Sequence, residues 1–153
     1  MATSAKKTTK SKAAAGTKLR CGLAFSVQVS PTDSTVTQGA TKGKHAGAVK
    51  CRAKELGTGV EFDSFTTDGA GDISGTWQEW FNTGSVYGSY TLAPNESRPP
   101  TAQSFAAASY TGGFTIKGGT GADAKTTGKG TMACATPNSI QYTCKESGKL
   151  RRM

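Results

Sequence analysis

Few side chains in this sequence have a type and spacing that suit catalysis, and Glu79 is the best placed of them. It shares its parity with Ile73, Trp77 and Phe81 in an alternating segment, so it points inward if that face is buried. A carboxyl group inside an apolar lumen has a raised pKa and can act as a general acid or base. The alternative is that Trp80 faces the interior and Glu79 lies in solvent. The sequence leaves both arrangements open.

The remaining titratable residues form no motif for catalysis or metal binding. His45 is the only histidine, and because no nucleophile-elbow motif accompanies it, we expect it to face solvent at the entrance of a strand. Glu61 and Asp63 alternate with Val60 and Phe62, so we expect both acids to point outward. We therefore predict no metal site and no cofactor, and the sequence does not identify an enzyme.

The four cysteines suggest two disulfides. Cys134 and Cys144 lie on either side of a turn at 137–138, where a hairpin places them roughly opposite each other. Cys21 and Cys51 lie on the first two expected strands and form the other pair of this scheme. The alternatives are a zinc site, which lacks a Cys-x-x-Cys pair and further histidines, and free buried thiols. Disulfides imply an oxidising compartment, and hence a secreted or periplasmic location.

The net charge of +9 over 153 residues belongs mainly to the chain ends. The first twenty residues hold six basic side chains and no acid, whereas residues 21–150 hold 11 basic and 10 acidic ones. We expect a basic flexible tail at 1–18, one domain at 19–150 and a basic end at 151–153. The tail does not match a signal peptide, since only three alanines stand where an apolar segment belongs. It is either a solvated leader or a polyanion-binding segment, whose nucleic-acid contacts would be Lys6, Lys7, Lys10 and Lys12.

Short alternating segments predict an all-β fold. Hydrophobic residues alternate strictly with others from Leu19 to Val29, which is typical of a strand with one buried face. Seven further strands are expected at 45–51, 59–66, 73–81, 86–92, 105–117, 128–135 and 139–145, where 105–117 is either one long strand or two strands broken near 112–113. Residues 31–43 and 93–101 are expected to form loops. No segment indicates a helix, and no apolar run approaches the roughly 20 residues of a membrane-spanning helix. Hairpins in chain order favour an up-and-down antiparallel eight-stranded barrel over a sandwich.

The glycine-rich stretch after residue 117 carries a family resemblance. Gly-Gly-Thr-Gly at 118–121 follows a strand and precedes a Gly-x-Gly strand at 128–130. This arrangement resembles the allene oxide cyclase and dirigent barrels and small secreted bacterial proteins with the same motif. The structural positions that match are Gly118, Gly119, Thr120, Gly121, Gly128 and Gly130.

The resemblance implies an eight-stranded antiparallel barrel, commonly trimeric. Its cavity guides cyclisation of a fatty-acid epoxide in allene oxide cyclases and orients phenoxy radicals in dirigent proteins. This sequence has Asp123 where many relatives have an aromatic residue, and Lys125 where a glycine is usual. No catalytic residue of either family matches a position here, so the activity is not transferred.

These observations predict a secreted barrel that binds a small, partly apolar molecule in its lumen. The expected lining residues are Phe25, Trp77, Phe81 and Tyr90. Barrels of this size either hold one small ligand or fill with side chains, so a filled structural or cell-envelope module is the first alternative. A cyclase or isomerase using Glu79 and polyanion binding through the tail are the others.

Overall fold

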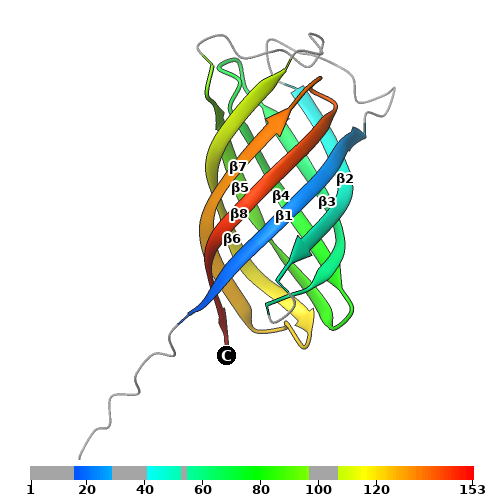
Figure 1. Cartoon of the computed structure of the whole chain (residues 1–153), viewed down its shortest axis with the longest axis vertical. Helices are drawn as coiled ribbons and strands as arrows, with labels where there is room; N and C mark the ends of the chain where they lie inside the picture. Colours follow the sequence, from blue (N-terminus) through cyan, green and yellow to red (C-terminus); the bar gives the residue numbers. More distant parts are fainter. Residues whose placement is uncertain (1–15, 29–40, 53–54, 97–106) are drawn as a thin grey trace, which may run out of the picture.

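The protein is a closed antiparallel β-barrel whose eight strands follow one another in chain order (Figure 1). The structure, a computed structural model, describes residues 16–28, 41–52, 55–96 and 107–153. The strands are β1 Thr17–Gln28, β2 Thr41–Cys51, β3 Thr58–Thr67, β4 Ile73–Phe81, β5 Gly84–Pro94, β6 Ala108–Gly121, β7 Thr126–Thr136 and β8 Gln141–Arg152. The predicted fold class is confirmed. Among the described residues there is no helix long and apolar enough to cross a membrane.

The sheet closes through pairing of β1 with β8, and the strands tilt across the barrel axis (Figure 1). The register shifts on going once around the barrel. A path that starts at Thr17 and passes from each residue to its partner in the next strand, β8 first and β2 last, returns to β1 at Val27, the partner of His45. The shift is therefore ten residues. Such a stagger goes with a tilt of roughly 35–45°. In a closed barrel, alternate residues of each strand face the lumen, so one parity of each strand forms the core.

The most deeply buried side chains lie toward the end of the barrel where β1 begins and β8 ends, which is called the terminus-bearing end below. The side chains with under 2% exposure all lie toward that end: Leu19, Val49, Ser85, Val86, Asp123, Thr126 and Leu150. The Arg152 guanidinium donates to the Glu55 carbonyl and to Asp123 Oδ1, the latter at 3.1 Å. The Glu55 carboxylate accepts from the Arg20 amide at 2.8 Å. Asp123 is thus a buried ion-pair partner, and β8 includes Arg151 and Arg152 of the basic C-terminal end.

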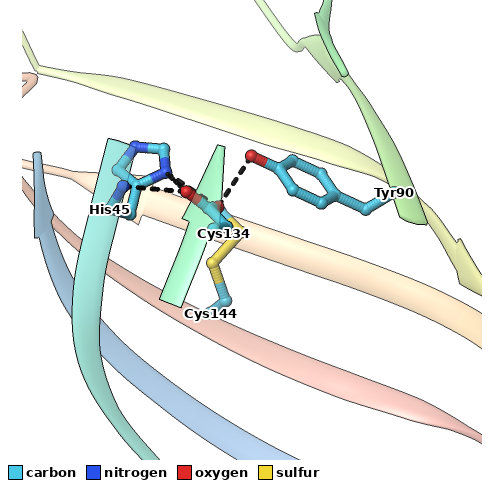
Figure 2. The surroundings of a disulfide bond; sticks show 5 residues. His45, Tyr90, Cys134 and Cys144 are labelled. Atoms are coloured by element: carbon cyan, nitrogen blue, oxygen red, sulfur yellow. Dashed lines mark hydrogen bonds and ion pairs between the residues drawn. A yellow bond between two sulfur atoms is a disulfide. The ribbon is translucent and has the colours of Figure 1, made fainter. Parts of the chain in front are cut away.

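Two disulfides join neighbouring strands, as the spacing predicted. Cys21 faces Cys51 across β1 and β2, with a Cα–Cα distance of 4.0 Å. Cys134 faces Cys144 across β7 and β8, with a Cα–Cα distance of 4.1 Å, and this bond is drawn in Figure 2. All four residues are at most 6% exposed. The cysteines therefore belong to the inward parity of their strands.

The glycine-rich corner lies later in the chain than expected. Gly118 and Gly119 belong to β6, which is continuous where a break near 112–113 was one alternative. The reversal occupies 122–125, after Gly121 in the left-handed region at φ 61°. Tyr87 pairs with Gly118 but Gly88 pairs with Ile116, so one extra residue forms a β-bulge in β6.

Three other strand boundaries differ from the sequence prediction. The second strand begins at Thr41, although residues 31–43 were expected to form a loop; residues 29–40 lie outside the described part. The fifth strand includes Ala93 and Pro94, which were placed in a loop. The last strand is longer at its C-terminal end, reaching Arg152. In the closed sheet the strands are longer than the alternating apolar segments of the sequence, because each further paired backbone group gains a hydrogen bond.

Glycine on the lumen side of β7 makes room for a core ring, and we expect Gly130→Ala to destabilise the barrel. A Cβ at Gly130 would lie 2.8 Å from Phe114 Cε1 and 2.7 Å from the Gly148 Cα, closer than real Cβ contacts allow. Such overpacking costs about 1–3 kcal/mol. Gly22→Ala is the control, since nothing lies within 4 Å of its added Cβ. Urea unfolding should separate the two variants, and equal midpoints would contradict this account of the glycine.

Candidate functional site

A histidine and an aspartate form a buried pair inside the barrel. His45 near the start of β2 and Asp63 in β3 are register partners, and both side chains point inward with 3% exposure. The His45 ring nitrogen Nδ1 lies 2.7 Å from Asp63 Oδ1 and 2.9 Å from Oδ2. The His45 backbone amide donates to Oδ1 at 2.8 Å. One carboxylate therefore fixes both the backbone and the ring of the histidine.

Tyr90 completes a three-residue hydrogen-bonded group. Its hydroxyl donates to Asp63 Oδ2 at 2.8 Å. Figure 2 shows the His45 ring and the Tyr90 hydroxyl directed toward each other, with dashed lines to the carboxylate between them. Burial, followed by the charge of Asp63, raises the pKa of Tyr90 well above its usual value, so the phenol keeps its proton. Three donors thus converge on a carboxylate that is removed from water.

Aromatic rings surround the histidine. The Phe65 ring stacks on His45 with centroids 4.2 Å apart, and the Phe25 ring lies 4.6 Å away at a tilted angle. The Tyr142 ring meets the imidazole edge-on at 5.5 Å and stacks with Phe25 at 5.4 Å. With Nδ1 bound to Asp63, the second ring nitrogen Nε2 has no hydrogen bond to a described residue. It is the ring atom that remains for a hydrogen bond to a further molecule.

Three glutamates face the lumen beside this group. Glu61 in β3 and Glu79 in β4 are register partners, and Glu146 comes from β8; their exposures are 5%, 3% and 7%. Burial, with smaller contributions from Asp63 and Glu146, raises the pKa of Glu61 to about 9. Burial also raises the pKa of Glu146 to about 8, and burial with the charges of Glu146 and Glu61 raises that of Glu79. These carboxyl groups therefore hold protons at neutral pH in the absence of a positive partner.

No lysine or arginine balances these glutamates in the described interior. Beside His45 the buried residues include four acids, Glu61, Asp63, Glu79 and Glu146, and no lysine or arginine is buried among the described residues. Glu61 Oε2 and Trp77 Nε1 are buried without a hydrogen-bond partner. Unpartnered buried polar atoms cost free energy. In this lumen they are groups that a bound molecule can satisfy.

The structure corrects three sequence predictions at this site. Glu61 and Asp63 point inward, while Val60 and Phe62 are 56% and 42% exposed. His45 is buried instead of facing solvent. For β4 the open alternative is resolved: Glu79 is inside, and Trp80 is outside with 42% exposure. Closure sets the parity of β3, because its inward face must match those of β2 and β4 at every paired position.

Part of this arrangement had a signal in the sequence. A disulfide on the buried face of β1 requires Cys51 to point inward, and His45 shares the parity of Cys51. Glu146 likewise shares the parity of Cys144 but was not singled out. Glu61 and Asp63 had no such marker, because the apolar residues of their strand favour the opposite face.

The four expected lining residues are all buried but do not lie together. Tyr90 belongs to the group formed by His45, Asp63 and Tyr90, which we call the His45 group, and the Phe25 ring contacts His45. Trp77 is the register partner of Asp63, and so lies next to the same group. Phe81 ends β4 four residues further on, about 13 Å along the strand toward the terminus-bearing end. One small molecule at His45 therefore does not reach Phe81.

The outer face of the barrel carries an apolar patch and a shallow groove. Val60 and Trp80 are register partners on the outside of β3 and β4, and Phe62 and Tyr87 lie on the same outer face. Small side chains, including Ala24, Ala48 and Ala133, line a mainly apolar groove across β1, β2, β6, β7 and β8. The described acids, histidine and cysteines form no group that could hold a metal ion.

Comparison with known proteins finds no matching family model, no matching curated protein and no matching solved structure. The resemblance to allene oxide cyclase and dirigent barrels therefore remains a prediction about ancestry. The arguments that follow rest on the geometry of the lumen.

The glutamates make stability depend on pH, and we expect the barrel to become less stable as the pH rises. Their folded-state pKa values lie above the value of 4.5 that they have in an unfolded chain. Between those values the folded protein holds protons that the unfolded chain has released. The free energy of unfolding therefore falls by up to about 1.4 kcal/mol per pH unit for each such carboxyl group, between about pH 5 and pH 9. Urea unfolding across that range measures the slope.

Glu61→Gln should make this slope shallower and stabilise the protein above about pH 8, because a neutral amide replaces a group that must hold a proton. Asp72→Asn, which changes an exposed carboxylate, is the matched control and should leave the slope unchanged. A Glu61→Gln variant with the wild-type slope would show that this side chain is solvated.

Proposed function

We propose that the barrel binds a small, partly apolar molecule in its lumen, beside His45. The observation that supports this most is the convergence of Phe25, Phe65 and Tyr142 on an imidazole whose orientation is set by Asp63. Apolar walls with a few oriented polar groups are the usual composition of a small-molecule site. The rings supply contact area, and His45 Nε2 supplies one directional hydrogen bond.

The two ends of the barrel differ in a way that supports this location. The most deeply buried side chains lie at the terminus-bearing end, where the Arg152 network also lies. The His45 group lies toward the opposite end, where Phe65 is only partly buried. We propose that a ligand enters from the His45 end. The two disulfides support a secreted or periplasmic location, because such bonds persist in oxidising compartments.

Native mass spectrometry of the protein purified from its own host should reveal a bound small molecule that is lost on denaturation. Tyr142→Ala should abolish the added mass, because it removes a ring that contacts both His45 and Phe25. Phe62→Ala removes an aromatic ring from the outer face and should retain the added mass. Thermal melts would confirm that both variants fold. A wild-type protein with no added mass, and no binding of a neutral apolar dye, would favour the filled structural barrel.

A second candidate function is acid–base catalysis in the same lumen. Two observations favour it: Asp63 holds Nδ1 of His45 as a positioning residue holds a catalytic base, and Glu79 is buried with a raised pKa. A base and a protonated acid that face the same lumen can move a proton across a bound substrate. Such chemistry fits the cyclase or isomerase class.

An allylic fatty-acid epoxide, the substrate type of the cyclases that the sequence resembles, is the probe for this activity. We expect the wild-type protein to accelerate its cyclisation, and Glu79→Gln to slow the reaction about 10²-fold or more if Glu79 is the acid. Asp72→Asn should have the wild-type rate. Equal rates for wild type and Glu79→Gln would remove Glu79 from the mechanism, even if the epoxide binds.

A further inference from the structure

The glutamates that line the lumen form a cluster with one sign of charge. Glu61 and Glu79 face each other across β3 and β4, and Glu146 approaches from β8. The charge of Glu146 acts on both of the others. Each is at least 93% buried, since the largest exposure is 7%. Three buried acids from three strands thus lie close enough for their charges to interact.

This cluster lacks the partner that buried acids normally have. Glu61 Oε2, in a side chain that is 5% exposed, accepts no hydrogen bond. The nearby Asp63 adds negative charge, and the imidazole that could offset it is bound to Asp63 through Nδ1. No lysine or arginine is buried among the described residues. Buried acids are normally paired with a cation or hydrogen-bonded.

The missing partner is best supplied by an organic cation. The described carboxylates and His45 have no metal-holding arrangement. A protonated primary amine has three N–H donors on one small group, which suits a buried cluster of three carboxyl groups drawn from β3, β4 and β8. Aromatic faces also attract an ammonium group, and Trp77, two residues from Glu79 on the same face of β4, provides one.

We infer that the lumen ligand is a small primary amine, bound as the ammonium ion with its nitrogen at Glu61, Glu79 and Glu146 and its apolar body against the rings around His45. This inference rests on the lumen binding proposed above and names the chemical class of its ligand. We further expect the amine to be short. Asp63 is hydrogen-bonded to His45 and its charge also acts on Glu61, so the two parts of the proposed site are close to each other.

Binding of the ammonium ion must then release protons. The glutamates are protonated without a cation, and a positive charge beside them favours their ionised form. Affinity for the amine should therefore increase as the pH rises from about 5 to 8. The ionisable groups that face this position are Glu61, Glu79 and Glu146 themselves, together with Asp63 and His45.

Isothermal titration calorimetry with three matched probes tests the inference: 2-phenylethylammonium, the neutral 2-phenylethanol and the anionic 3-phenylpropanoate. The ammonium ion should bind most tightly, with proton release seen as a heat that depends on the ionisation enthalpy of the buffer. Glu61→Gln and Glu146→Gln should each weaken it about tenfold or more, since a charge-assisted bond is lost. Asp72→Asn should not. The glutamine variants should remain folded, because they remove buried ionisable groups.

Other outcomes overturn the inference in distinguishable ways. If phenylethanol binds as tightly as the ammonium ion, and Tyr142→Ala weakens both equally, the lumen binds ligands but not as cations. Tighter binding of phenylpropanoate would also overturn the assignment while leaving lumen binding intact. If no probe binds, the amine class is wrong. Native mass spectrometry of the protein from its own host then tests lumen binding separately. If that spectrum also shows no bound molecule, the proposed function is wrong as well.

Discussion

Closure of the sheet is the constraint on which the other features of this protein depend. Once β1 pairs with β8, every side chain of the inward parity is withdrawn from water, whatever its chemistry. Apolar residues gain from this, but an acid must find donors or keep its proton. Asp63 takes the first course, with donors from His45 and Tyr90. Glu61 takes the second, with a pKa of about 9.

Much of the fold could be predicted from local patterns, because the information needed was local. Alternation in β1 and the opposed positions of Cys134 and Cys144 depend only on neighbouring residues and one turn. The strand ends were less predictable, since β2, β5 and β8 extend beyond their apolar segments through pairing with other strands. The turn after Gly121 was displaced for a similar reason: the partner strand β5 keeps Gly118 and Gly119 in the sheet.

The candidate site was less accessible to sequence reasoning because it contradicts local preference. In β3, the side chains of Val60 and Phe62 favour burial, yet they lie outside while Glu61 and Asp63 lie inside. No property of this strand alone predicts that choice. It follows from register with His45 on one side and Glu79 on the other. Natural proteins depart from local sequence preferences mainly where function requires it. The inverted pattern of β3 is therefore a further reason to propose a site at this position.

The distribution of packing within the barrel explains how such an interior can be stable. Leu19, Val49, Val86 and Leu150 fill the terminus-bearing end, and two disulfides limit the unfolded chain. These features supply stability without using the residues around His45. The lumen around His45 can therefore retain acids that lack partners, a state that lowers stability but leaves these groups available to the ligand that we propose. If the interior were filled with apolar side chains of the same size, the barrel would gain stability, because these acids would no longer have to be buried without partners.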